Sequence, residues 1–111
     1  MTSERIYSFL GLAKKAGKLF SGDDTCERLI KSKKARLTII AVDSSPNTSK
    51  KFTDKSYAVG IPLKVFGTKE LLGRYTGKEI RAVLVITDEG FAKRIIEMIE
   101  EYSISGGDLN G

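Results

Sequence analysis

Residues 37–46 read LTIIAVDSSP, and this stretch decides the fold class. Its first six letters are β-branched or apolar, which is typical of a central strand covered on both faces. Pro46 suits the first position of a helix, where its missing amide would be unpaired anyway, and Ser44 or Ser45 suits the cap before it. The stretch therefore predicts a buried strand that passes directly into a helix over roughly residues 46–57.

The rest of the chain alternates between helical and extended patterns. Apolar residues spaced i, i+3, i+4 and i+7 predict a helix over 4–15 that Gly17 ends, and a second helix follows from 24 to about 32. The helix over 46–57 is unusually polar around Phe52 and Tyr57. Downstream, the patterns predict a half-buried strand over 63–66, a short helix from Thr68 to about Leu72 that Gly73 breaks, a buried strand over 82–86, and a helix to residue 102 capped by Thr87 or Asp88.

This alternation predicts the α/β fold class, as a three-layer α-β-α sandwich around a central mixed sheet of about four strands. The sequence shows no internal repeat and no linker, so residues 1–102 are predicted to form a single domain. The remaining stretch, 103–111, has little apolar content and three glycines, and we expect it to be disordered.

The composition is that of an ordinary soluble globular protein, with 41% hydrophobic and 30% charged residues in a chain of 111. One cysteine cannot build a disulfide framework and favours a reducing, cytoplasmic setting. No apolar run approaches the roughly 20 residues that a membrane-spanning helix needs, so we expect no membrane partner.

Positive charge is concentrated in the first half of the chain. Residues 1–60 hold 12 Lys and Arg against 6 Asp and Glu, whereas the remainder holds 7 against 8, so the net charge of +5 arises from the first half. Such asymmetry suits a face that binds a polyanion. A merely solvated basic surface is the alternative.

The first candidate surface is the stretch 17–28, which joins the apolar pair Leu19-Phe20 to a helix start through Gly22. Ser21 or Asp23 is expected to cap that helix, whose free amides and dipole favour an anion. Two aspartates in the same turn argue against a simple phosphate site.

A polar platform is the interpretation that remains, because Asp24, Arg28 and Lys31 share one helical face at i, i+4 and i+7. The alternative is a well-capped surface helix with an Asp24–Arg28 ion pair.

The second candidate surface is the stretch 73–81, which carries two glycines, three cations and Ile80. Its alternative is an ordinary connection whose glycines allow turns, with Ile80 starting the next strand.

Catalytic chemistry has little support in the sequence. The chain has no histidine, no nucleophile-elbow motif, no phosphate-loop motif and no dinucleotide-binding motif. Cys26 falls on the inner face of its helix, and for Asp43 a cap or loop role is favoured over catalysis. We therefore predict no enzyme, no cofactor, no metal site and no small-molecule substrate.

The stretch from Leu10 to Lys93 resembles the kink-turn-binding ribosomal protein family, which includes L7Ae, L30e and Gadd45 relatives, because several short motifs occur in the same order as in that family. The resemblance is greatest to the bacterial YlxQ-like branch. The motifs that carry the resemblance are LGLAKKAGK (10–18), SG (21–22), ARL (35–37), IAVDSS (40–45), NT (47–48), KK (50–51), IP (61–62), LG (72–73), GKE (77–79) and TDEGFA (87–92).

The resemblance implies an α-β-α sandwich that binds structured RNA without catalysis or cofactor. In the family, a Gly-x-Asn-Glu segment at the start of the second helix reads the bases of tandem sheared G·A pairs. A lysine one turn later assists this recognition. A short loop before the last strand covers an unpaired, flipped-out base. Gly22 matches the glycine and Arg28 the lysine, but Asp24-Thr25 replaces Asn-Glu. Threonine cannot reproduce the bidentate contact of glutamate with guanine. A changed RNA target, or recognition by shape and phosphates, is therefore expected.

Together these observations predict a monomeric, ribosome-associated RNA-binding protein of the cytoplasm, in which amides around Gly22 and nearby cations hold phosphates and Ile80 packs on an unstacked base. The alternative is a protein-interaction module that uses the same surface without RNA. The predicted RNA-binding residues are Lys15, Lys18, Ser21, Gly22, Asp23, Asp24, Thr25, Arg28, Lys31, Asp43, Lys78, Glu79, Ile80 and Arg81.

Overall fold

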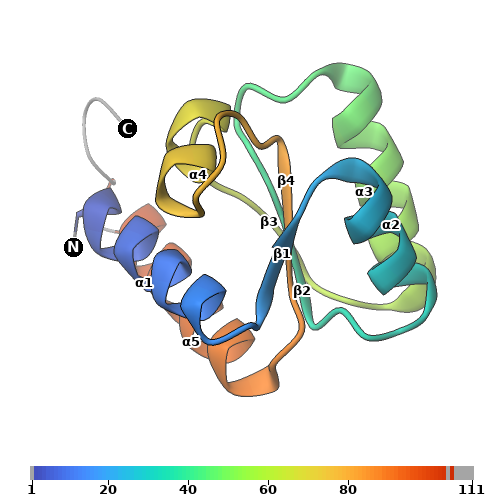
Figure 1. The fold of residues 1–111 in the computed structure, drawn as a ribbon, viewed down its shortest axis with the longest axis horizontal. Helices are drawn as coiled ribbons and strands as arrows, with labels where there is room; N and C mark the ends of the chain where they lie inside the picture. Colours follow the sequence, from blue (N-terminus) through green and yellow to red (C-terminus); the bar gives the residue numbers. More distant parts are fainter. Residues whose placement is uncertain (1, 105, 107–111) are drawn as a thin grey trace.

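A four-stranded mixed sheet forms the centre of the computed structural model, which describes residues 2–104 and 106 (Figure 1). The strand order is β1-β4-β2-β3, in which β4 runs antiparallel to both neighbours and β3 runs parallel to β2. The predicted sandwich and mixed sheet are confirmed. The elements are α1 (Ser3–Lys15), β1 (Leu19–Ser21), α2 (Asp23–Lys31), β2 (Leu37–Ile40), α3 (Pro46–Val59), β3 (Leu63–Val65), α4 (Lys69–Tyr75), β4 (Val83–Ile86) and α5 (Glu89–Ile104).

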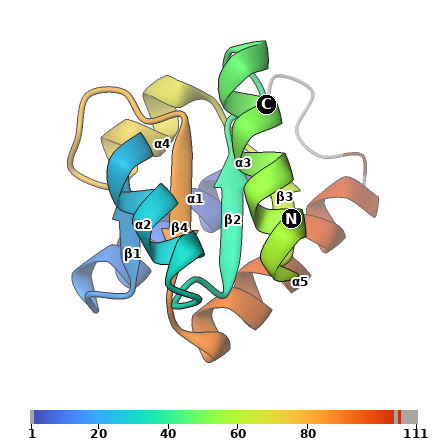
Figure 2. The same ribbon diagram turned by 90° about the vertical axis from the view of Figure 1, so that its right-hand side faces the viewer.

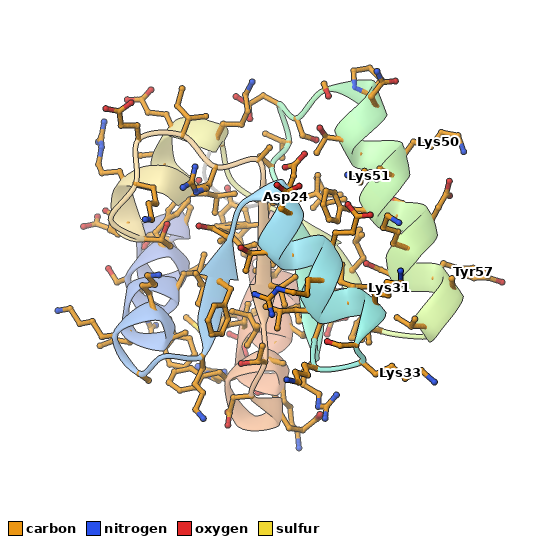
Figure 3. All side chains as sticks on the ribbon, turned by 45° about the vertical axis from the view of Figure 1, so that its right-hand side comes forward. Asp24, Lys31, Lys33, Lys50, Lys51 and Tyr57 are labelled. Carbon is orange, nitrogen blue, oxygen red and sulfur yellow. The ribbon has the colours of Figure 1, made fainter. Side chains whose placement is uncertain are left out.

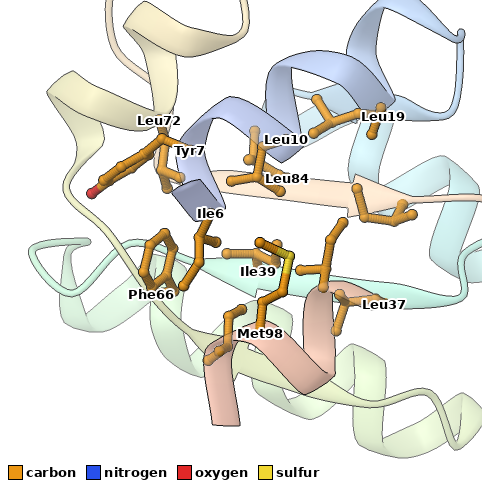
Figure 4. Packing of buried hydrophobic residues seen from close by; sticks show 14 of the residues in the cluster. Ile6, Tyr7, Leu10, Leu19, Leu37, Ile39, Phe66, Leu72, Leu84 and Met98 are labelled. Carbon is orange, nitrogen blue, oxygen red and sulfur yellow. The ribbon is translucent and has the colours of Figure 1, made fainter. Parts of the chain in front are cut away.

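Helices cover both faces of the sheet. Helices α1, α4 and α5 lie on one face and α2 and α3 on the other, as the two ribbon views show (Figures 1 and 2). The first face packs a large apolar cluster that includes Ile6, Leu10 and Ile95 (Figure 4). The second packs a smaller cluster around Ile30 and Phe52. Residues of the central strands alternate between these two cores, so all four residues of β2 and of β4 are buried.

Strand β2 is shorter than the sequence pattern predicted. It ends at Ile40, and Val42 is 62% exposed, so the prediction of a buried strand to residue 42 is wrong at its end. The physical reason lies in the backbone pairing, because the amide of Val42 donates to the carbonyl oxygen of Gly67 in the loop after β3. This bond joins Val42 to the loop beyond the last residue of β3, outside the regular strand pairing.

Helix α3 begins as predicted and runs two residues further, to Val59. The Ser45 hydroxyl accepts a hydrogen bond from the Thr48 amide at 3.1 Å, and Gly60 ends the helix in the left-handed region. Of its two aromatic residues only Phe52 is buried, whereas Tyr57 is 87% exposed. The inward position one residue before Tyr57 is Ser56, whose hydroxyl bonds to the buried Thr38 hydroxyl of β2 at 2.9 Å.

Helix α4 contradicts the prediction that Gly73 breaks it. Thr68 caps the helix as expected, with its hydroxyl 3.2 Å from the Leu71 amide, but the helix continues through Gly73 to Tyr75. Gly73 is buried, and a Cβ there would lie 2.6 Å from the Glu79 carbonyl oxygen. The glycine is therefore required for close approach of the following loop and not for a turn.

Helix α5 extends past the predicted domain boundary at residue 102. Asp88 caps it, since its carboxylate accepts from the Phe91 amide at 2.8 Å, and Tyr102 packs edge-on against Phe66. Because this contact anchors the last turn, Ser103 and Ile104 are helical, and the prediction of a disordered tail is wrong for those two residues. Apart from Gly106, the rest of the predicted tail lies outside the described residues.

Candidate nucleic-acid interface

The two candidate surfaces meet at one end of the sheet. Ser21, the last residue of β1, pairs in register with Leu84 of β4, and Ile40 at the end of β2 pairs with Val83. The end of β1, the end of β2 and the start of β4 are therefore neighbours. Since α2 follows β1 directly and the loop 76–82 leads into β4, the start of α2 lies beside that loop (Figure 1).

A side-chain hydrogen bond joins these two segments. The Arg81 Nε donates to the Ser21 hydroxyl oxygen at 2.9 Å, although the two residues are 60 positions apart. Arg81 also donates from its guanidinium to the Ile80 carbonyl at 3.0 Å and from its backbone amide to the Lys69 carbonyl at 3.0 Å. Arg81 therefore fixes the loop to both β1 and α4.

The start of α2 differs from the capping prediction. Its N-cap residue is Gly22, at φ 95°, and no side chain caps the helix, so the assignment of Ser21 or Asp23 as the cap is wrong. The Ser21 hydroxyl serves Arg81 instead. A positive φ suits glycine, which lets the chain turn sharply from β1 into α2. The first-turn amides have no side-chain cap, which is the condition that favours an anionic or base-edge acceptor.

Two exposed carboxylates, Asp23 and Asp24, stand at this helix start. No ion pair joins Asp24 to Arg28 in the described chain, so the expected i, i+4 pair is absent and the Arg28 guanidinium is not engaged by Asp24. Arg28 and Lys31 are exposed further along α2, with Lys31 at its far end (Figure 3).

Lys51 of α3 is a neighbour that the predicted site did not include. Its Nζ lies 2.8 Å from Glu27 of α2, and Lys55 lies 3.2 Å from the same carboxylate. Hydrogen bonds from Lys51 and then Lys55 lower the pKa of Glu27, and Glu27 raises the pKa of Lys51, with smaller contributions from Asp23 and Asp24. Figure 3 shows Lys51 facing the helix that carries Asp24. The Lys50-Lys51 pair was the sequence signal that could have identified it.

The predicted surface stretch 73–81 is exposed over residues 77–80, whereas Gly73 and Thr76 within it are buried. Ile80 is 58% exposed and is not part of β4, which begins at Val83, so the alternative that Ile80 starts the strand is wrong. Lys78 and Glu79 are exposed as well. Lys78 also approaches α1, because Lys14, Lys15, Gly77 and Lys78 border one surface hollow of about 530 Å³. Lys15 is thus brought near the loop.

Two predicted RNA-binding residues, Lys18 and Asp43, do not lie with the others at the start of α2. Lys18 precedes β1, and its carbonyl accepts from the Thr87 amide at 2.9 Å, so it lies at the opposite end of the sheet from Gly22. Asp43 follows β2, and its carboxylate accepts from the Lys69 amide at 2.9 Å at the start of α4. This contact gives Asp43 the loop role that the sequence favoured.

Cys26 is a core residue, as its helical position predicted. It is fully buried, and burial raises the pKa of its thiol to about 12, with Asp23 adding to the rise and Arg81 opposing it. A thiol this basic is a poor nucleophile. Across residues 2–104 and 106, no group of three or more His, Cys, Asp and Glu side chains could hold a metal ion, and no helix is long and apolar enough to cross a membrane.

Comparisons with known proteins place the chain in a family. A family model described as ribosomal protein L7Ae/L30e/S12e/Gadd45 matches residues 4–96. The RNA-binding protein YlxQ of Bacillus subtilis (strain 168) is 38% identical over 100 residues, covering 90% of this chain and 100% of the relative. The RNA-binding protein YlxQ of Enterococcus faecium is 36% identical over 97 residues, covering 87% and 93%.

Solved structures show the same fold. A protein with unknown function from Bacillus halodurans C superposes with a TM-score of 0.82 at 34% identity, over 86% of this chain and 96% of that one. The 15.5kD RNA binding protein of Giardia lamblia superposes with a TM-score of 0.75 at 21% identity, over 89% and 88%, a likeness that concerns the fold alone.

Both YlxQ relatives are named for RNA binding and not for a reaction, in agreement with the prediction that the chain is not an enzyme. The family match covers most of the chain, and these relatives align over nearly their whole length at more than a third identity. The chain belongs to the ribosomal protein L7Ae/L30e/S12e/Gadd45 family, in its bacterial YlxQ-like branch.

Proposed function

We propose that this protein binds structured RNA, and that it does so as a cytoplasmic monomer associated with ribosomes. The recognition surface is the start of α2 together with the loop 76–82. The observation that carries the proposal is the 2.9 Å hydrogen bond between Arg81 and Ser21, which holds these two segments side by side. The names of the YlxQ relatives support the choice of RNA as the partner.

Base recognition in this proposal centres on the first turn of α2. Asp24 is an acceptor only and takes donors from guanine, while the Thr25 hydroxyl both donates and accepts. Asp23 is exposed beside them, and Gly22 lets the RNA approach the free backbone amides closely. Arg28, which has no Asp24 partner, is available for a bidentate contact with guanine.

The loop supplies the second part of the surface. The exposed face of Ile80 packs on an unstacked base, as apolar side chains do in RNA recognition. Lys78, Lys15 and Lys31 neutralise phosphates around the platform, and Glu79 accepts from exocyclic amines. Asp43 contributes by holding the start of α4, to which the Arg81 amide is bonded.

Crosslinking in cells, followed by sequencing of the bound RNA, tests the proposal directly. We expect enrichment of structured segments of ribosomal RNA, with crosslinked peptides from residues 21–28 and 78–81. If about five phosphates are neutralised, the logarithm of the binding constant falls with the logarithm of salt concentration at a slope of roughly −3.5 to −4.5. A slope near zero in a filter-binding titration would contradict the electrostatic part of the proposal.

Nuclease treatment separates this function from a protein-interaction module on the same surface. Loss of ribosomal co-sedimentation after nuclease supports RNA as the partner. Co-sedimentation that persists after nuclease, with no RNA recovered by crosslinking, would contradict it.

A further inference from the structure

A second basic surface lies at the other end of α2, and we propose that it binds the phosphate backbone of the same RNA where it continues past the platform. This inference rests on the proposed function. We call the surface the α2–β2 groove; it is a hollow of about 450 Å³ lined by Phe20, Arg28, Leu29, Lys33, Lys34, Arg36 and Thr87.

The charge of the groove is of one sign. Four of its lining side chains are cations and none is acidic. Within the described ranges, Arg36 alone among these four forms an ion pair, with Glu89 at 3.6 Å, and the Arg36 side chain is 44% exposed and that of Glu89 82%. With only one of the four cations paired to a carboxylate, the groove carries an excess of positive charge that favours an external anion.

The floor of the groove is apolar. Leu29 is 6% exposed and Phe20 packs partly buried against the same core. Low-dielectric groups beside the four cations strengthen the field of those cations at the groove. A surface lysine cluster over solvated polar residues would lack this property.

Two carbonyls near the end of α2 are already hydrogen-bonded where the helix reaches the groove. The carbonyl of Leu29 accepts from the amides of Lys34 and Ala35, at 3.0 and 3.2 Å, and the Ile30 carbonyl accepts from the Lys33 amide at 3.0 Å. These bonds form the usual left-handed close of a helix and satisfy the Leu29 and Ile30 carbonyls, and the groove cations oppose the negative potential that remains at the helix end.

Lys33 occupies the left-handed position of this close, with φ at 61°, and is the one non-glycine residue of positive φ in the described ranges. Glycine or asparagine is favoured at such a position. A lysine here places a cation at the mouth of the groove at a conformational cost, which is consistent with a use for its charge.

The path between platform and groove follows α2. From Asp23 to Lys31 the helix spans about 12 Å at 1.5 Å per residue, a length that a few nucleotides cover. Arg28 belongs to both sites, since it lies on the platform and also lines the groove. Lys18 also lies at the groove end of α2, because its carbonyl accepts a hydrogen bond from the amide of Thr87, which lines the groove.

The test compares two double variants matched in charge. Lys33→Asn/Lys34→Gln removes two cations from the groove, with asparagine chosen because it tolerates the left-handed position. Arg5→Gln/Arg94→Gln removes two cations from α1 and α5 on the opposite face of the sheet. Binding to size-selected fragments of ribosomal RNA is measured by filter binding over a salt series, and thermal melting checks that both variants are folded.

The groove variant is expected to lower the salt slope by about 0.9 per lost phosphate contact, which at about 0.1 M salt is about eightfold in affinity per contact. The control variant should keep the slope of the wild type. Equal affinities and slopes for the two variants would contradict RNA binding by the groove and would leave the proposed function unaffected.

Two further outcomes also decide the matter. Unchanged RNA binding with lost ribosomal co-sedimentation would assign the groove to a protein partner and overturn the inference. Failure of the wild type to bind any fragment at low salt would overturn the proposed function together with the groove.

Discussion

The Arg81 guanidinium donates a hydrogen bond to the Ser21 hydroxyl across 2.9 Å, and so couples the start of α2 to the loop before β4. Ser21 also pairs with Leu84 through the backbone, so side-chain and main-chain bonds hold the same junction. Two segments that the sequence offered as separate surfaces are one surface because of this junction.

A double-mutant cycle on Ser21→Ala and Arg81→Ala measures this coupling. Because each substitution removes the same hydrogen bond, we expect the double variant to lose less RNA affinity than the sum of the two single losses, with a coupling of about 0.5–1.5 kcal/mol. Isothermal titration with ribosomal RNA fragments provides the measurement. Strict additivity would show that the bond does not hold the surface together for binding.

Arg28→Ala tests the base-reading role of α2. Since no ion pair joins Arg28 to Asp24 among the described residues, and Arg28 is exposed, the substitution should leave the melting temperature nearly unchanged. RNA affinity should fall by about 1–3 kcal/mol if the guanidinium pairs with a guanine. Arg28→Lys is the matched control, because it keeps the charge and loses the bidentate geometry. Full rescue by lysine would reduce Arg28 to a phosphate contact.

Gly73→Ala should distort the loop that carries Ile80. A Cβ at residue 73 would lie 2.6 Å from the Glu79 carbonyl oxygen and 2.8 Å from the Ile80 amide nitrogen, and both are backbone atoms. We expect a loss of stability of about 1–3 kcal/mol, as for overpacking, with weaker RNA binding. Urea unfolding and filter binding measure the two effects.

Gly90→Ala is the control for this substitution, since the nearest atom to its added Cβ is the end of the Asp88 side chain at 3.3 Å. Its stability should change by less than about 1 kcal/mol. Equal effects of the two alanines would refute the close-approach role of Gly73.

The buried thiol of Cys26 makes the fold sensitive to alkali. Its pKa is about 12 in the folded chain against 9.0 for an ordinary thiol. Between pH 9 and pH 12 the unfolded chain binds fewer protons at this thiol than the folded chain does. The free energy of unfolding therefore falls as pH rises above 9, and this thiol has no effect on it below pH 9. Burial raises the pKa of Tyr7 above its usual 10.0, which adds a fall of the same sign at higher pH.

Urea unfolding at a series of alkaline pH values measures this dependence. We expect Cys26→Ala to be less stable at neutral pH, through lost packing, and to show a shallower fall above pH 9. Rapid reaction of the native thiol with a disulfide reagent near neutral pH would contradict its burial.

Local chemistry made much of the fold predictable. Capping by Ser45, Thr68 and Asp88 depends on a side chain and an amide three residues later, so the sequence itself carries the signal. The buried strands β2 and β4 follow from short apolar runs, and the class of fold follows from their alternation with helices. The candidate site at Gly22 came from a glycine placed before a predicted helix start, and the resemblance added its base-reading role.

Tertiary contacts decided the rest. A three-residue strand such as β1 has too weak a pattern to predict and is stabilised by its pairing with β4. The same pairing offers the Ser21 hydroxyl to Arg81, which is why it does not cap α2. Gly73 was misread because its neighbour in space, Glu79, is not within its own helix. Sequence alone determined most of the elements and the helix starts at Ser45, Thr68 and Asp88, because those depend on neighbours along the chain. Only the folded structure determined which surfaces meet, because that depends on residues brought together across the sheet.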